Sequence, residues 1–98
     1  MNREIYLQKL QALELEGINI ERIAKAYDFG AVAHEGQFRK SGEPYFIHPA
    51  EVSLILAELE MDDDTLIAGL LHDVIEDTEY TYEDLSELFG DSVAYLVD

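Results

Sequence analysis

The sequence predicts an all-α protein, a bundle of about five to six helices without a sheet. Apolar residues recur at spacings of three and four along most of the chain, which is the period of an amphipathic helix. Residues that commonly cap helices precede several of these segments. The short run at residues 45–47 is too brief to anchor a sheet. The predicted helices span residues 4–16, 20–34, 49–60, 64–77, 82–88 and 92–98.

The first two predicted helices are separated by a short turn. Gly17 suits the position just after a helix end, because glycine reaches a left-handed backbone conformation without steric cost. Asn19 can then cap the second helix through its side-chain oxygen. The apolar sides of the two helices consist of Ile5, Leu7, Leu10 and Leu13, and of Ile20, Ile23, Ala24, Tyr27 and Ala31. Residues 36–44 are then expected to form a loop.

The third and fourth helices follow this loop. Pro49 suits a first helical turn, where no backbone N–H donor is needed, and this places His48 at the N-terminal boundary. The apolar stripe of the third helix consists of Val52, Ile55, Leu56 and Leu59. One of the three aspartates at residues 62–64 is expected to cap the fourth helix, and the others lie at the positive end of its dipole.

The C-terminal segments begin with a capping signal. Thr81 and Asp84 resemble a capping box with aspartate in place of glutamate or glutamine. This helix is expected to end before Gly90, and Asp91 can cap the last one. No glycine, proline or basic residue closes the last segment before Asp98, so we expect a truncated chain.

Length and composition indicate one small globular domain. The chain has 98 residues, 48% of them hydrophobic, so a packed core is feasible. It has no cysteine, which excludes disulfides and thiolate chemistry. The N-terminus lacks a signal-peptide run and no segment is long enough to span a membrane. We therefore expect a soluble cytoplasmic protein without membrane contact.

The charge is strongly negative and unevenly distributed. The formal net charge is -16, from 22 acidic and 6 basic residues, and all the basic residues lie in the first forty positions. Such a surface does not favour nucleic acid, which proteins bind by neutralising phosphates, but it attracts divalent cations. The adjacent pair Arg39 and Lys40 is a local positive spot in this negative field.

The run from Gly69 to Thr78 places a His-Asp pair and a Glu-Asp pair among aliphatic residues. If the helix is continuous and His72 is set at zero, Glu76 lies at about 40°, Asp73 at about 100° and Asp77 at about 140°. The opposite arc is aliphatic and consists of Leu70, Leu71, Val74 and Ile75. One side can therefore pack into a core while the other carries an imidazole and three carboxylates.

Two interpretations of this polar side remain open. It is either the solvated side of an acidic helix or a metal site, because a bound cation reverses the repulsion between crowded carboxylates. His48, which could instead satisfy a backbone group, can join His72 and Asp73 as a ligand. Mixed nitrogen and oxygen ligation suits Mn, Fe or Zn better than Ca and leaves open positions for water. Glu76 and Asp77 would then act on a metal-bound water.

The loop at residues 39–41 and the nearby Tyr45 bear on substrate binding. Arg39, Lys40 and Ser41 offer a guanidinium, an ammonium and a hydroxyl in one loop, which can stack on a base or hold phosphate. Tyr45 could add a stacking surface, although a half-buried tyrosine is the simpler expectation. His34 lies on the small-residue side of the second helix, where a structural role is favoured.

Three blocks of the chain, residues 33–49, 70–78 and 89–98, resemble the start of the hydrolase domain of RelA/SpoT homologues. The resemblance implies an HD-type helical domain that uses Mn²⁺ to remove the 3′-pyrophosphate of guanosine tetra- and pentaphosphate, leaving GDP or GTP. The matching metal ligands are His48, His72 and Asp73. Glu76 and Asp77 match the acidic pair that handles the attacking water, and Arg39, Lys40 and Ser41 match the loop that holds the guanine nucleotide.

The resemblance also implies a missing part. The family's fourth metal ligand is an aspartate well downstream of Asp98, so we expect residues 1–98 to be the N-terminal part of a hydrolase domain with weak metal binding and little turnover. The domain would belong to a bifunctional synthetase and hydrolase, or to a small stand-alone hydrolase. The alternatives are a non-catalytic helical regulatory module that retains the motif, and an HD phosphohydrolase for another nucleotide.

Overall fold

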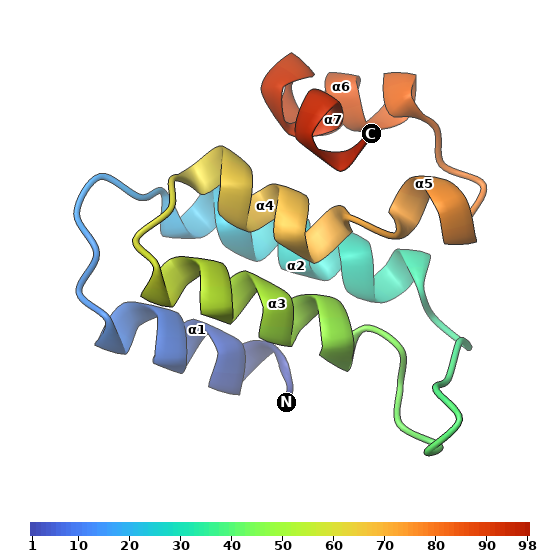
Figure 1. Cartoon of the computed structure of the whole chain (residues 1–98), viewed down its shortest axis with the longest axis horizontal. Helices are drawn as coiled ribbons and strands as arrows, with labels where there is room; N and C mark the ends of the chain where they lie inside the picture. Colours follow the sequence, from blue (N-terminus) through green and yellow to red (C-terminus); the bar gives the residue numbers. More distant parts are fainter.

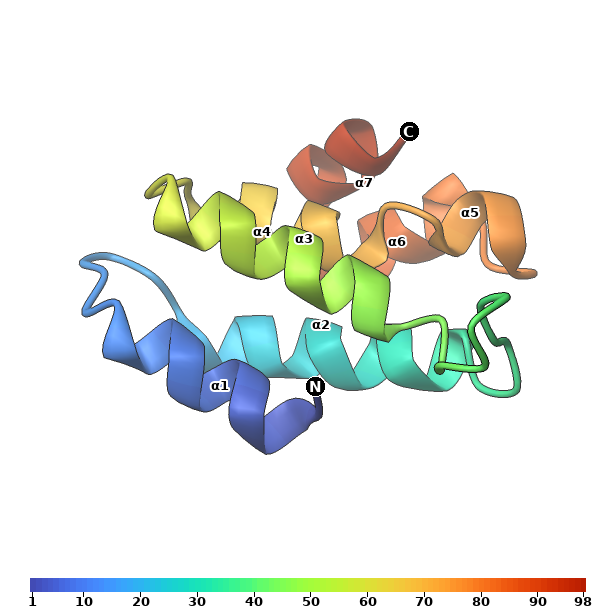
Figure 2. The ribbon, with the colours of Figure 1, turned by 60° about the horizontal axis from the view of Figure 1, so that its bottom comes forward.

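A computed structural model describes all 98 residues and confirms the all-helical prediction. Its helices are α1 (Arg3–Ala12), α2 (Ile20–Ala33), α3 (Ile47–Glu58), α4 (Asp63–Leu71), α5 (Val74–Asp77), α6 (Tyr82–Phe89) and α7 (Asp91–Val97). The one β-type feature is an isolated bridge between Phe38 and Pro44. The two chain termini lie on opposite sides of the bundle (Figures 1 and 2). None of the helices is long and apolar enough to cross a membrane.

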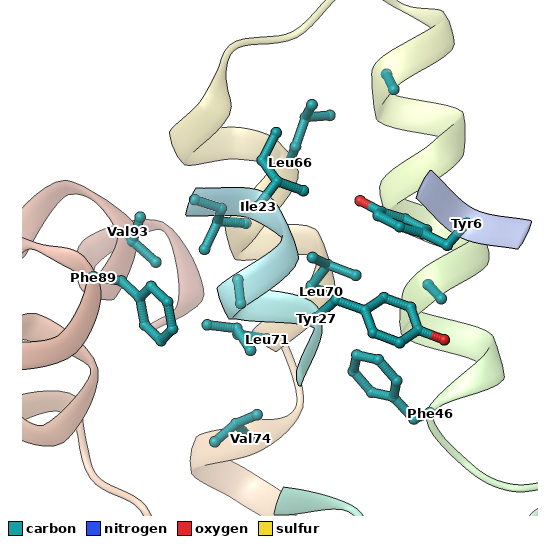
Figure 3. Close-up of a cluster of buried hydrophobic side chains, with 14 of the residues drawn as sticks. Tyr6, Ile23, Tyr27, Phe46, Leu66, Leu70, Leu71, Val74, Phe89 and Val93 are labelled. Carbon is teal, nitrogen blue, oxygen red and sulfur yellow. The ribbon is translucent and has the colours of Figure 1, made fainter. Parts of the chain in front are cut away.

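The centre of the bundle is α4, which packs against α2, α3 and α7. Every residue of α4 from Leu66 to Leu71 is buried. Figure 3 shows Leu70 and Leu71 inside the buried cluster, with side chains of α6 and α7 on one side and Tyr6 and Phe46 on the other. The element that leads into the His-Asp pair is therefore the most enclosed part of the fold.

A buried chain of polar groups ties α1 and α3 to α4. Ser53 Oγ donates to the Leu66 carbonyl at 2.9 Å, so the Tyr6 hydroxyl, 2.8 Å from Ser53 Oγ, is the donor of that second bond. Burial raises the pKa of Tyr6 to about 12, because the charged phenolate would lose its water there; the Ser53 bond opposes this rise and the nearby Tyr27 adds slightly to it. The bonds satisfy three groups that would be costly to bury alone.

Two helical glycines allow the close packing that positions the site. A Cβ on Gly30 of α2 would overlap the ring of Phe46 and lie 3.3 Å from Leu71 Cδ2. A Cβ on Gly69 of α4 would lie 2.8 Å from Leu56 Cδ1 and 3.4 Å from Ser53 Cα. Glycine at these two crossings lets α4 lie close to α2 and α3 just before the His-Asp pair.

Three predicted caps are confirmed. The side chains of Asn19 and Asp62 accept hydrogen bonds from the backbone N–H groups of Arg22 and Thr65. Thr81 and Asp84 form the complete capping box of α6. The predicted cap of the last helix is wrong by one residue, since Gly90 with a φ of 98° is the N-cap and Asp91 is already helical.

The first helix ends earlier than predicted. It stops at Ala12, and Glu14 takes a left-handed conformation with a φ of 51°. Two forces favour this early end. Continuing to residue 16 would place Glu14 and Glu16 at the negative end of the helix dipole, and leaving the helix lets Leu15 and Ile18 pack against the core.

The predicted continuous helix over residues 64–77 is wrong. The helical hydrogen bonding is interrupted at His72 and Asp73, which separate α4 from α5; His72 keeps helical backbone angles, and Asp73 departs from them with a φ of -100° and a ψ of 0°. In a continuous helix the Asp73 N–H would bond to the Gly69 carbonyl, but here that carbonyl accepts a bond from the His72 side chain instead. The helical-wheel angles from His72 to Glu76 and Asp77 therefore do not apply. Leu70, Leu71 and Val74 are buried, as the aliphatic arc predicted.

Candidate metal and nucleotide site

The break between α4 and α5 presents the His72 and Asp73 side chains next to each other. His72 Nδ1 lies 2.7 Å from the Gly69 carbonyl, which can only accept, so Nδ1 carries the proton of this bond. The other ring nitrogen, Nε2, lies 3.1 Å from Asp73 Oδ2. In the neutral ring Nε2 is unprotonated, so a lone pair on nitrogen faces a carboxylate oxygen. A shared cation would stabilise this pair, and a backbone bond to the far nitrogen is typical of metal-binding histidines.

His48 approaches the same place from the first turn of α3. Its ring centroid lies 5.9 Å from that of His72, with the ring planes inclined at 72°. The two histidines therefore come from different helices, α3 and the end of α4, which pack against each other. The structure thus places His48 near the His72–Asp73 pair, and the assignment of all three side chains as ligands stays a prediction.

The three side chains do not yet form a closed ligand set. No group of three histidine, cysteine, aspartate or glutamate side chains in the chain is close enough to hold a metal ion as it stands. The donor types nevertheless fit a transition metal, since two imidazoles and a carboxylate are the mixed set that such ions prefer. His72 and Asp73 are already paired, and His48 would have to move toward them.

Tyr45 contacts the candidate metal site through a bond that the sequence did not predict. Its hydroxyl donates a hydrogen bond to Asp73 Oδ2, the same oxygen that faces His72. This bond raises the pKa of Tyr45 to about 12, because Asp73 favours the protonated phenol; burial and the charges of Asp73 and Asp77 add to the effect. Tyr45 is half-buried, as expected, but its carboxylate partner lies 28 residues away and left no local signal in the sequence.

The acidic pair of α5 faces solvent. Glu76 and Asp77 are both exposed, and Glu76 makes no hydrogen bond or ion pair. The charge of Asp77 contributes to the raised pKa of Tyr45, after the larger effects of Asp73 and burial. The backbone carbonyl of Asp77 accepts a bond from Gln37 Nε2 at 2.9 Å. The structure thus brings Asp77 toward the site and leaves Glu76 free to meet a ligand.

The basic loop lies exposed between α2 and α3. Arg39, Lys40 and Ser41 line a shallow hollow together with Phe38, Glu43 and Tyr45. Neither Arg39 nor Lys40 forms an ion pair, so both charges are available to an anion. Tyr45 touches both sites, because it lines this hollow and donates to Asp73. The hollow and the His-Asp pair are therefore neighbours.

His34 is a buried residue that contacts side chains next to this loop. It is only 2% exposed, and its ring lies 5.0 Å from the Tyr45 ring and 6.1 Å from the Phe46 ring. Its Nδ1 bonds to Gln37 Oε1 at 2.9 Å, whereas its buried Nε2 has no partner. This burial agrees with the structural role expected for His34, and it identifies Gln37 as a further residue that the sequence did not single out.

Comparison with known proteins supplies the family. The model of the HD domain family matches residues 26–98. The chain belongs to the HD-domain family. The match includes the loop, the His-Asp pair and α5, so the site described above lies within the matched part of this HD domain.

Individual relatives confirm the resemblance to RelA/SpoT homologues. The chain is 58% identical over 79 residues to the bifunctional (p)ppGpp synthase/hydrolase SpoT of Escherichia coli K12, which covers 81% of this chain and 11% of that protein. It is 56% identical over 80 residues to a GTP pyrophosphokinase of Myxococcus xanthus, covering 82% and 11%. It is 56% identical over 78 residues to a guanosine-3′,5′-bis(diphosphate) 3′-pyrophosphohydrolase of Aquifex aeolicus, covering 80% and 11%. The HD-domain chain thus matches about a tenth of the length of these relatives.

Proposed function

We propose that the chain is the N-terminal part of a metal-dependent hydrolase domain that removes the 3′-pyrophosphate of guanosine tetra- and pentaphosphate. The products are pyrophosphate and GDP or GTP. The observation that carries the proposal is the His72–Asp73 pair, in which a ring nitrogen and a carboxylate oxygen lie 3.1 Å apart and could share one cation. Relatives named as (p)ppGpp synthase/hydrolase and as 3′-pyrophosphohydrolase support the choice of substrate. A substrate of this kind also favours a cytoplasmic location.

His48, His72 and Asp73 would hold the metal, for which we propose Mn²⁺. When bound, such an ion lowers the pKa of a coordinated water and polarises a phosphate oxygen. Tyr45 keeps Asp73 oriented, and the bond to the Gly69 carbonyl orients the His72 ring so that Nε2 faces Asp73. A fourth ligand from elsewhere in the natural protein is part of the proposal, because three side chains bind such a metal only weakly.

Glu76 and Asp77 would take the proton from the attacking water and orient it. Both carboxylates are exposed and can therefore meet solvent and substrate. Arg39 and Lys40 would bind the phosphates or stack on the guanine ring, and Ser41 would donate a hydrogen bond. Because Tyr45 joins the loop to the His-Asp pair, one end of the nucleotide can lie at the loop and its scissile phosphate at the metal.

The domain is proposed to belong to a bifunctional alarmone synthetase and hydrolase. The names of the relatives, which include a synthase/hydrolase and a pyrophosphokinase, support this assignment. Residues 1–98 alone are expected to turn over little. A non-catalytic regulatory role is the second candidate, and the open arrangement of the three ligands favours it.

The test is pyrophosphate release from guanosine tetraphosphate by the natural gene product that carries these 98 residues. We expect release that requires Mn²⁺ and falls by at least a hundredfold in His72→Ala and Glu76→Gln. Glu83→Gln is the matched control, since Glu83 is an exposed acid on α6, and it should retain wild-type activity. Wild-type protein that releases no pyrophosphate with Mn²⁺ would favour the regulatory role.

A further inference from the structure

The loop between α2 and α3 is closed at its base by backbone hydrogen bonds. Tyr45 N donates to the Gln37 carbonyl at 2.9 Å, and Arg39 N donates to the Glu43 carbonyl at 2.8 Å. The isolated bridge between Phe38 and Pro44 lies between these two bonds. Gln37 and Tyr45 are thereby held side by side, and the tip that carries Arg39 and Lys40 moves with them.

Both base residues also reach the segment from His72 to Thr78, here called the catalytic segment. Tyr45 donates to the Asp73 carboxylate at the start of this segment. Gln37 Nε2 donates to the Asp77 carbonyl near its end, at 2.9 Å. The bonds span 28 and 40 residues of sequence. The loop base therefore holds the catalytic segment at two points, Asp73 just before α5 and Asp77 at its last residue.

A hydrogen bond from His34 fixes the orientation of the Gln37 side-chain amide. Buried His34 donates from Nδ1 to Gln37 Oε1, and this leaves the Gln37 NH₂ group for the Asp77 carbonyl. A reversed amide would put two oxygens against each other at Asp77. The bond from His34 thus keeps the Gln37 NH₂ group directed toward the Asp77 carbonyl.

The other side-chain bonds that restrain the catalytic segment are local: His72 Nδ1 bonds to the Gly69 carbonyl at 2.7 Å, and Thr78 Oγ1 donates to the Val74 carbonyl at 2.6 Å. The helix of this segment, α5, is a single turn, and Val74 is its one buried residue. Its own backbone bonds are Asp77 N to Asp73 O and Thr78 N to Val74 O. The loop and α5 lie at the same end of the bundle (Figures 1 and 2). Two long-range side-chain bonds are therefore a substantial part of what holds this segment in place.

We propose that Gln37 and Tyr45 are positioning residues that couple the nucleotide loop to the catalytic segment, so that metal bound at one orders the other. The coupling rests on the proposed function for the identity of the two ligands. It is reciprocal, because a ligand that favours the bonded arrangement at one site strengthens binding at the other. Asp73 can accept from Tyr45 and bind a cation at once, since a carboxylate has four lone-pair positions.

The first test uses the metal-free 98-residue chain and hydrogen–deuterium exchange read by mass spectrometry. Gln37→Ala and Tyr45→Phe each remove one of the two long-range bonds. Each variant should therefore raise the exchange rate of peptides covering residues 73–78 about fivefold. Tyr45→Phe keeps the ring that packs on His34 and removes only the hydroxyl. Tyr95→Phe and Gln8→Ala are the controls, since both positions are exposed and far from the loop in sequence. If residues 73–78 exchanged at the wild-type rate in both Gln37→Ala and Tyr45→Phe, the proposal would be overturned.

The second test adds Mn²⁺ alone and compares the catalytic segment with the loop. In wild type the metal should slow exchange in residues 72–78 and also in residues 38–44, which hold no metal ligand. In Tyr45→Phe the loop response should fall at least threefold while the segment still responds, and a purely structural role would not produce that split. If Mn²⁺ slowed exchange in residues 72–78 of the wild type but not in residues 38–44, the coupling would be overturned. If Mn²⁺ does not slow exchange in the catalytic segment, the proposed metal site is contradicted. The metal-free test would then still decide whether Gln37 and Tyr45 restrain this segment.

Discussion

The carbonyl oxygen of Gly69 lies 2.7 Å from Nδ1 of His72, and this bond links the end of α4 to the chemistry of the imidazole. A carbonyl one turn from a helix end has lost its backbone donor. The His72 side chain supplies the missing N–H and fixes its own tautomer in the same contact. The helix break and the orientation of Nε2 therefore have a common origin, and two of the four predictions below concern residues next to this bond.

The first prediction concerns metal and stability. At Mn²⁺ concentrations about ten times Kd, linkage stabilises the folded chain by about 1.4 kcal/mol. For a domain of this size that corresponds to a rise in Tm of roughly 6 to 11 °C. Asp73→Ala should abolish the rise in a thermal scan, because it removes a ligand and the Tyr45 acceptor.

The control for the metal effect is electrostatic. A chain with net charge -16 gains stability from any divalent cation that screens its acids. The scan is therefore repeated with Mg²⁺ at equal ionic strength and with Asp98→Ala, which removes an exposed acid elsewhere. Equal shifts in wild type and Asp73→Ala would rule out Asp73 as a ligand.

The second prediction concerns the basic loop. Arg39→Ala in the natural gene product should raise KM for guanosine tetraphosphate about tenfold or more while kcat changes little, because a bidentate guanidinium contact is lost in substrate and transition state alike. Lys9→Ala, an exposed lysine on α1, is the control. A defect confined to kcat would instead put Arg39 in contact with the reacting phosphate.

The third prediction compares the two packed glycines. Gly30→Ala drives a methyl group into the stiff ring of buried Phe46 and should cost about 1 to 3 kcal/mol of unfolding free energy. Gly69→Ala meets the flexible end of Leu56, and the helix propensity of alanine offsets about 1 kcal/mol. Urea unfolding should therefore show Gly69→Ala within about 1 kcal/mol of wild type. A larger loss in Gly69→Ala than in Gly30→Ala would contradict this ranking.

The fourth prediction is a pH dependence from Tyr6. Its pKa is raised from 10.0 in the ordinary side chain to about 12 in the folded protein. Between these values the folded state holds a proton that the unfolded state releases, so the free energy of unfolding falls as pH rises from 10 to 12. Below pH 10 both states are protonated, and this contribution is constant.

Tyr6→Phe removes the titrating group, so its stability should fall less steeply than that of wild type across this window. Urea titrations at intervals from pH 9 to 12 measure the slope. Tyr95→Phe, which changes an exposed tyrosine, serves as the control. Parallel curves for wild type and Tyr6→Phe would show that the buried phenol does not contribute.

The elements that the sequence predicted well depend on neighbours in the chain. Asn19, Asp62 and Thr81 cap helices through bonds to residues three positions on, and such signals are visible in any short window. The aliphatic arc before the His-Asp pair was also correct, because burial of Leu70 and Leu71 follows from composition alone.

The errors lie where a distant or competing contact decides the backbone. Periodicity continues through residues 72 and 73, so no local pattern indicates that an imidazole replaces a backbone donor at Gly69. Tyr45 and Gln37 act on residues 28 and 40 positions away, which a single sequence does not reveal. The candidate ligands His72 and Asp73 stay predictions, and they stood out in the sequence because their residue types are chemically unusual for an aliphatic segment. Their supporting residues have ordinary polar side chains that occur at many exposed positions.

The placement of the basic residues also allows cleavage at the loop to be measured by digestion with trypsin. Trypsin cleaves after lysine and arginine, and the last such residues are Arg39 and Lys40 at the exposed tip of the loop. Everything from Ser41 to Asp98 therefore leaves trypsin as one acidic peptide. Exposed loop tips are cut most readily, so the rate at which this peptide appears measures how often the loop opens. Limited digestion can follow ligand binding at the loop without any label.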